Sequence, residues 1–119
     1  MAENIGPVET NYNIYDRLVA QEAIKWLSAH GNQEKPWVLF VSMVAPHFPL
    51  IAPQKFYDLY DQLGLMPTKP RETPEHPWHH AMRNCQIMDN FTLERTRVAL
   101  TSYYGLVTFV DDLIGKILE

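Results

Sequence analysis

Cysteine is almost missing from this sequence of 119 residues, which contains only Cys85. A lone cysteine cannot form an internal disulfide bond or a zinc site of four thiolates. A basic excess is missing as well: the formal net charge is -4, which argues against a nucleic-acid partner. No apolar run approaches the ~20 residues that span a bilayer, so we expect no membrane partner. The first residues also lack the basic stretch and apolar core of a secretory signal.

What the sequence does contain is typical of one globular domain, with 46% hydrophobic and 20% charged residues. Helical spacing predicts helices at about 15–30, 53–62 and 92–118. We expect Asn13 to cap the first of these helices and Thr92 to cap the last. The side chains expected to face the core share helical spacing: Val19, Ala23, Trp26 and Leu27, then Leu100, Tyr103, Val107, Val110, Ile114 and Ile117.

The segment from Trp37 to Val44 is apolar at nearly every position and rich in β-branched and aromatic residues. A half-buried strand would alternate polar and apolar residues, so this pattern predicts a parallel strand covered on both faces. Such a strand needs neighbours for its amides and carbonyls. We therefore predict an α/β fold with one central strand, at about 37–44, that belongs to a larger sheet than this chain contains.

The region from Gly64 to about Asp89 carries four prolines and little periodicity. It predicts an irregular surface segment with a turn or two of helix near Trp78 to Met82. The three histidines at 76, 79 and 80 lack cysteine or acidic partners at ligand spacing, apart from Glu75, and we interpret them as solvated or substrate-lining rather than metal-binding. In the last helix, we expect close packing at Gly105 or Gly115.

Several of these residues together resemble the type I sulfatases of the alkaline phosphatase superfamily, the arylsulfatase and choline-sulfatase-like enzymes. The resemblance rests on the strand at 35–43, on Pro46-His47-Phe48-Pro49 after it, and on the helix at 97–118 with Tyr103-Tyr104-Gly105 and Asp111-Asp112. The helix at 16–27 is similar to the one that precedes this strand in the family. The resemblance implies that residues 1–119 form a single partial domain, the central part of a sulfatase catalytic domain.

The resemblance implies hydrolysis of sulfate esters, on a small molecule or a glycan, with a formylglycine nucleophile and a calcium ion. We find neither the sequence motif that forms the formylglycine nor the ligands that hold the calcium ion. Cys85 stands in Asn84-Cys85-Gln86-Ile87 without the required Pro and Arg, and the family's acidic metal ligands have no counterpart. The one active-site position that carries over is His47, as a catalytic and substrate-binding residue near the leaving oxygen. Trp78 and His79 are weaker candidates for contact with the organic part of the substrate.

The residues themselves support a role for His47, which follows the carboxyl end of the predicted strand, where parallel sheets bind ligands. An imidazole can donate a hydrogen bond to a sulfate oxygen or protonate a leaving alkoxide. Cleavage also needs a nucleophile and concentrated positive charge, so we expect the isolated chain to be inactive. Two alternatives stay open. One is a phosphodiesterase or phosphonate hydrolase of the same superfamily. The other is a non-catalytic module that forms homo-oligomers through the unpaired strand or a swapped last helix.

Overall fold

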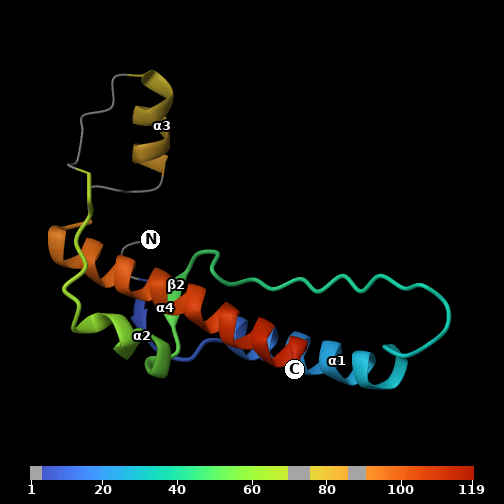
Figure 1. Ribbon diagram of the computed structural model, residues 1–119. Coiled ribbons are helices and arrows are strands. Elements are labelled where there is room, and N and C mark those ends of the chain that lie inside the picture. Colours follow the sequence, from blue (N-terminus) through green and yellow to red (C-terminus); the bar gives the residue numbers. More distant parts are fainter. Residues whose placement is uncertain (1–3, 70–75, 86–90) are drawn as a thin grey trace.

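The computed structural model describes residues 4–69, 76–85 and 91–119. The elements follow in the order β1 (Ile5–Pro7), α1 (Asn11–His30), β2 (Leu50–Ala52), α2 (Gln54–Asp61), α3 (Pro77–Cys85) and α4 (Leu93–Leu118). Helices therefore combine with a small parallel sheet, and the predicted α/β class is confirmed (Figure 1). The three predicted helices correspond to α1, α2 and α4.

The sheet consists of β1 and β2, which run parallel with Ile5 opposite Leu50 and Pro7 opposite Ala52. α4 crosses this pair, and the backbone N–H of Gly6 donates to Ser102 Oγ at 3.2 Å. Sequence analysis predicted neither strand, because three residues are too short to display an alternating pattern, and β1 also contains a glycine and a proline.

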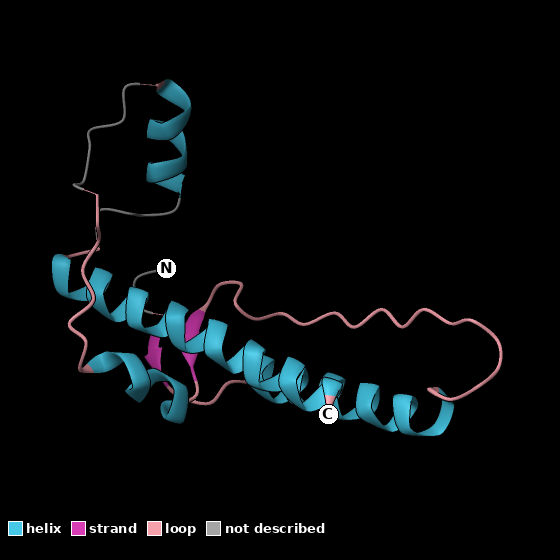
Figure 2. Cartoon of the chain, viewed as in Figure 1, coloured by secondary structure: helices cyan, strands magenta, loops and turns pink. Residues whose placement is uncertain are grey.

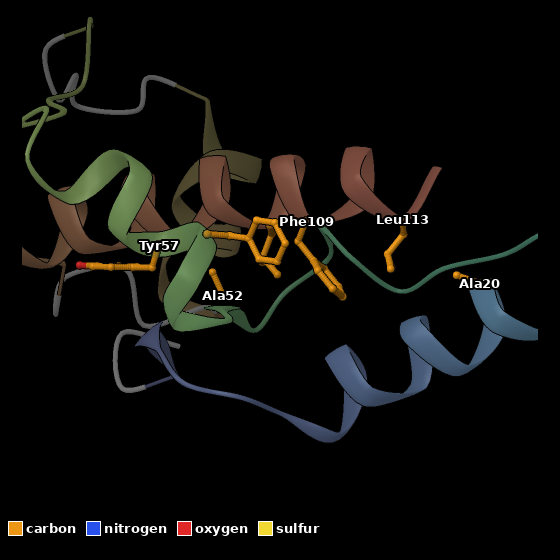
Figure 3. Close-up of a cluster of buried hydrophobic side chains, with 7 residues drawn as sticks. Ala20, Ala52, Tyr57, Phe109 and Leu113 are labelled. Atoms are coloured by element: carbon orange, nitrogen blue, oxygen red, sulfur yellow. The ribbon is translucent and has the colours of Figure 1, made fainter. Parts of the chain in front are cut away.

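The core lies where α4 meets α1, β2 and α2 (Figure 3). Phe109 is fully buried, and its ring lies 5.5 Å from that of Phe56 on α2. Leu113 extends the same cluster toward Ala20 on α1. The buried apolar side chains of the cluster are Ala20, Ala52, Phe56, Tyr57, Leu106, Phe109 and Leu113.

Both predicted caps fall next to a helix start, but only one is correct. Thr92 caps α4, where its hydroxyl accepts from the backbone N–H of Arg95 at 3.2 Å. The prediction for α1 is wrong, since Thr10 is the cap and Asn13 is its partner three residues later. Asn13 Oδ1 accepts from the Thr10 backbone N–H at 2.9 Å, which completes a capping box and starts the helix at Asn11 rather than near Tyr15.

The buried faces of α1 and α4 also differ from the predicted stripes. α1 buries Asn13, Asp16, Ala20 and Ala23, so only Ala23 belongs to both sets. On α4 the predicted Tyr103, Val107 and Ile114 are each more than two-fifths exposed. The residues that α4 buries instead are largely small ones on the adjacent face: Ala99, Thr101, Ser102, Gly105, Leu106, Phe109 and Leu113. Small side chains let β1, β2 and α2 approach the helix axis, and this close packing selects the face.

The predicted central strand at 37–44 does not form. This segment runs back along the molecule as an extended chain between α1 and β2 (Figure 2). Val38 is 95% exposed and Phe40 is 88% exposed, whereas Leu39, Val41 and Met43 are half-buried. The alternation is that of a strand, but no other described segment pairs with it, and a strand needs a hydrogen-bonded neighbour.

α3 stands clear of the other elements in Figure 1 and buries none of its residues. The helix expected near Trp78 to Met82 is confirmed and is longer, with Pro77 as its first residue. The rest of the predicted irregular region lies partly outside the described residues, at 70–75 and 86–90. Within the described residues, none of the helices is both long enough and apolar enough to cross a bilayer.

Candidate functional site

His47 lies in the short loop that joins the extended segment to β2. Pro46 and Pro49 flank it, and both are preceded by cis peptide bonds. The backbone N–H of His47 donates to the carbonyl oxygen of Val44 at 2.9 Å, which closes a turn. The residue is exposed, so its imidazole is open to a ligand from solvent.

The orientation of the His47 ring is set by its own loop. Nδ1 lies 2.7 Å from the carbonyl oxygen of Phe48. A carbonyl oxygen can only accept, so Nδ1 carries the hydrogen in this contact. A neutral ring then has a lone pair on Nε2, and an imidazolium has an N–H there. His47 can therefore donate to an anion through Nε2 only as the cation.

The carboxylate of Asp16 holds the backbone immediately before this loop. Asp16 on α1 is fully buried. Its Oδ1 accepts from the backbone N–H of Val44 at 2.7 Å, and its Oδ2 accepts from that of Ala45 at 2.9 Å. Sequence analysis missed this residue as part of the site. The available signal was an aspartate on the same helical face as Ala20 and Ala23, where an unpaired charge is not expected.

Trp78 and His79 lie on α3, and both are exposed. In Figure 1, α3 stands away from the loop before β2, so the described residues do not bring either side chain to His47. The backbone N–H groups of His79 and His80 both donate to the carbonyl oxygen of His76, at 2.9 and 3.3 Å. A substrate contact by Trp78 or His79 stays a prediction.

The described residues do not fit the cofactors that the resemblance implies. No three His, Cys, Asp or Glu side chains gather into a possible metal site anywhere in the described ranges. Cys85 is exposed at the last residue of α3, in a sequence without the proline and arginine of the formylglycine motif. These residues therefore provide neither a calcium site nor a formylglycine.

A groove of about 720 Å³ runs between α1 and the extended segment. Tyr15, Leu18 and Trp26 line it on the helix side, and Leu39 and Val41 line it on the other. Apolar side chains dominate this lining. Its polar groups, among them Glu22, Lys25 and His30, lie on α1. The groove leads along the segment that ends at the His47 loop, but His47 is not part of its lining.

The shifted pKa values of the described residues lie elsewhere, where α2 meets α4. Burial, followed by the nearby Asp61 carboxylate, raises the pKa of Tyr57. The Arg97 guanidinium hydrogen-bonds Glu94, which lowers the pKa of that exposed carboxyl and raises the pKa of Arg97 itself. Arg97 also lies 3.6 Å from Asp61 at the end of α2, whereas Glu94 pairs with Arg97 along α4, and the three groups are not arranged around His47.

Comparison with known proteins agrees with the resemblance. The sulfatase family model matches residues 2–119. The chain is 26% identical to a choline-sulfatase of Rhizobium meliloti (strain 1021) over 92% of its own length and 23% of the relative's. It is 29% identical to an arylsulfatase of Clostridium perfringens (strain 13 / Type A), over 98% of its own length and 23% of the relative's.

A third relative is an ulvan-active sulfatase of Formosa agariphila, 28% identical over 85% of this chain and 17% of the relative. The chain thus spans about a sixth to a quarter of the length of the curated relatives it matches. The match to the family model extends over nearly every residue and includes α1, the His47 loop and α4. On this ground, the chain belongs to the sulfatase family.

Proposed function

We propose that this chain is the part of a sulfuric ester hydrolase that supplies an imidazole to the sulfate group of its substrate. The observation that carries the proposal is His47. It is exposed between two prolines at the end of the extended segment, in a chain of the sulfatase family. The resemblance assigns the nucleophile and the metal ligands of the reaction to polypeptide outside this chain, and the described residues contain no cluster of side chains that could hold a metal ion.

The chemistry assigned to His47 follows from its hydrogen bond. With Nδ1 donating to Phe48 O, a second hydrogen on Nε2 makes the ring an imidazolium. A sulfate ester is an anion, and its oxygens accept hydrogen bonds from an imidazolium. Nε2–H can then donate to an ester oxygen and pass its proton to the leaving alkoxide as the S–O bond breaks.

The first test uses histidine side-chain NMR of the 119-residue chain, titrated with inorganic sulfate at constant ionic strength. The ring signals of His47 are expected to shift saturably with the sulfate concentration. His30 is a matched control, because its Nδ1 also contacts a carbonyl oxygen, that of Trp26 at 3.1 Å. Equal movement of His30 and His47, or no movement of His47, would contradict the proposal.

The second test is turnover of 4-nitrophenyl sulfate by the same chain. We expect only the background rate, since one imidazole provides neither nucleophile nor concentrated positive charge. Clear turnover would mean that the reacting groups have been assigned wrongly. Bis(4-nitrophenyl) phosphate serves as the parallel substrate, and turnover of the diester alone would favour the phosphodiesterase alternative.

A second candidate activity, self-association, is favoured by the extended segment. Residues 36–46 contain no charged side chain, and within the described ranges no hydrogen bond to the backbone of 38–43 is present. We propose that two copies of this chain pair their 37–44 segments antiparallel about a two-fold axis. Light scattering over a concentration series should reveal a dimer, and a monomer at every concentration would exclude this pairing.

A further inference from the structure

The most deeply buried charged side chain of the described residues has a defined pair of partners. Asp16 is fully buried, and each of its two carboxylate oxygens accepts one backbone N–H, from Val44 at 2.7 Å and Ala45 at 2.9 Å. Burial of a carboxylate is costly unless hydrogen bonds replace its water. Two charge-assisted bonds offset that cost here, so the contact holds the backbone of Val44 and Ala45 to α1.

The backbone held by Asp16 is also the base of the His47 turn. Val44 donates its N–H to Asp16, and its carbonyl oxygen accepts the N–H of His47 at 2.9 Å. Ala45 donates to the other carboxylate oxygen, and Pro46 has no N–H to donate. Every backbone donor from Val44 to His47 is therefore used, and the connection from α1 to His47 consists of three hydrogen bonds.

The side chain at this position must accept two donors at once. Asparagine has one carbonyl oxygen, and its NH₂ group would face the second amide N–H. Glutamate has two acceptors but is longer by one methylene group, which moves them away from the helix. The position is rigid, because it lies in the second turn of a capped 20-residue helix. The aspartate side chain therefore suits these two backbone N–H groups better than asparagine or glutamate would.

We propose that Asp16 is a positioning residue for His47: it clamps the amides of Val44 and Ala45 and so sets where the imidazole meets the sulfate group. This role rests on the proposed function of His47 as a sulfate contact. The clamp itself does not touch substrate. It acts through the Val44–His47 turn, which links a helix to a loop 28 residues further along the chain.

The test compares Asp16→Asn and Asp16→Ala with the unmodified 119-residue chain by NMR. Removing both acceptors in Asp16→Ala should speed hydrogen exchange of the Val44 and Ala45 amides about tenfold or more. It should also shift the His47 imidazole signal and weaken its response to inorganic sulfate. Asp16→Asn retains one acceptor and nearly the same shape, so a smaller change in each quantity is expected even if Asp16→Ala does not fold.

Asp112→Asn is the matched control, because it also neutralises a helical aspartate, one that pairs with Lys116 Nζ at 2.6 Å. It should leave the His47 signal unchanged.

Two results would overturn the proposal. One is faster Val44 and Ala45 exchange with an unmoved His47 signal. The other is exchange in α4 that rises as much as exchange in the loop, which indicates general loosening. The proposed function has a separate test: it would be contradicted if the unmodified chain did not respond to sulfate. The hydrogen-exchange rates and the position of the His47 signal require no sulfate, so they still test the role of Asp16 in that case.

Discussion

Tyr57 carries a polar group into the core. Its side chain is almost fully buried on α2 and packs in the cluster around Phe109. Burial raises the pKa of its hydroxyl above the ordinary value, and the Asp61 carboxylate raises it further, while Arg97 acts in the opposite direction. The neutral phenol is therefore the form that the folded chain accommodates.

This shift predicts a loss of stability in alkali. The folded pKa of Tyr57 lies above that of the unfolded chain, about 10. The associated stability is fully present below pH 10 and is lost as the pH rises through the folded value. Thermal unfolding midpoints measured up to about pH 11 should fall less steeply in Tyr57→Phe. Tyr12→Phe, at a half-exposed tyrosine, should behave as the unmodified chain, and an equally steep fall in Tyr57→Phe would refute the assignment.

At the scale of elements, α4 packs against the rest of the chain through a glycine. A Cβ atom built on Gly105 would lie 3.0 Å from Ala52 Cβ and 3.2 Å from the backbone carbonyl of Phe56. β2 and α2 therefore approach α4 so closely that a side chain at this position requires its neighbours to move by a few tenths of an ångström. The predicted close packing at one of the two glycines is confirmed for Gly105. Gly115 has no neighbour within 4 Å of that position.

The two glycines give a matched pair of substitutions. Gly105→Ala should destabilise the chain by about 1–3 kcal/mol, because the backbone of Phe56 has to move. Gly115→Ala should stabilise it by up to about 1 kcal/mol, since alanine favours a helix and meets open space. Urea unfolding monitored by circular dichroism measures both. Stabilisation by Gly105→Ala would show that the contact with α2 is looser than described.

At the scale of the whole molecule, the chain exposes more surface than a compact protein of its size. Its accessible surface is 8676 Å², about 2,000 Å² above the value expected for a 13.8 kDa monomer. Its radius of gyration is 18.1 Å, whereas about 13.5 Å is typical for this length. The surplus of this one chain is larger than the ~800 Å² that each partner buries in a standard protein interface. Phe40 and the outer stripe of α4, Tyr103, Val107 and Ile114, contribute to it.

The proposed pairing of 37–44 predicts which substitution abolishes the dimer. Phe40→Lys replaces an exposed apolar side chain with a charge on the strand of each copy, which disfavours edge-to-edge pairing, and should give a monomer by light scattering. Leu118→Lys is the control, because Leu118 is 80% exposed at the end of α4, and the dimer should persist there. A dimer that survives Phe40→Lys would exclude strand pairing and favour exchange of α4 between copies.

Predictions from the sequence were correct where the structure depends on residues close together in the sequence. The cap at Thr92, the length of α4 and the helical turn near Trp78 follow from patterns only a few residues long. The predictions were wrong for the faces of α1 and α4, because both helices carry apolar residues on more than one side and packing partners decide which side is buried. They were also wrong for Asn13, whose side chain supports the cap at Thr10 rather than forming the cap itself.

For the candidate site, too, some features could be predicted from the sequence and others were decided only by folding. The sequence identified His47 as a candidate because it lies between two prolines after an apolar segment. The β-branched and aromatic residues of 37–44 predicted that this segment is extended. Folding was needed to bring Asp16 to amides 28 and 29 positions away, and Gly6 to Ser102 across 96 positions. Folding also decided that the side chains of residues 38–43 alternate between exposed and half-buried while the segment has no paired strand within the described residues. Short-range patterns set dihedral preferences and caps, whereas burial and long-range hydrogen bonds depend on partners whose proximity no local pattern encodes.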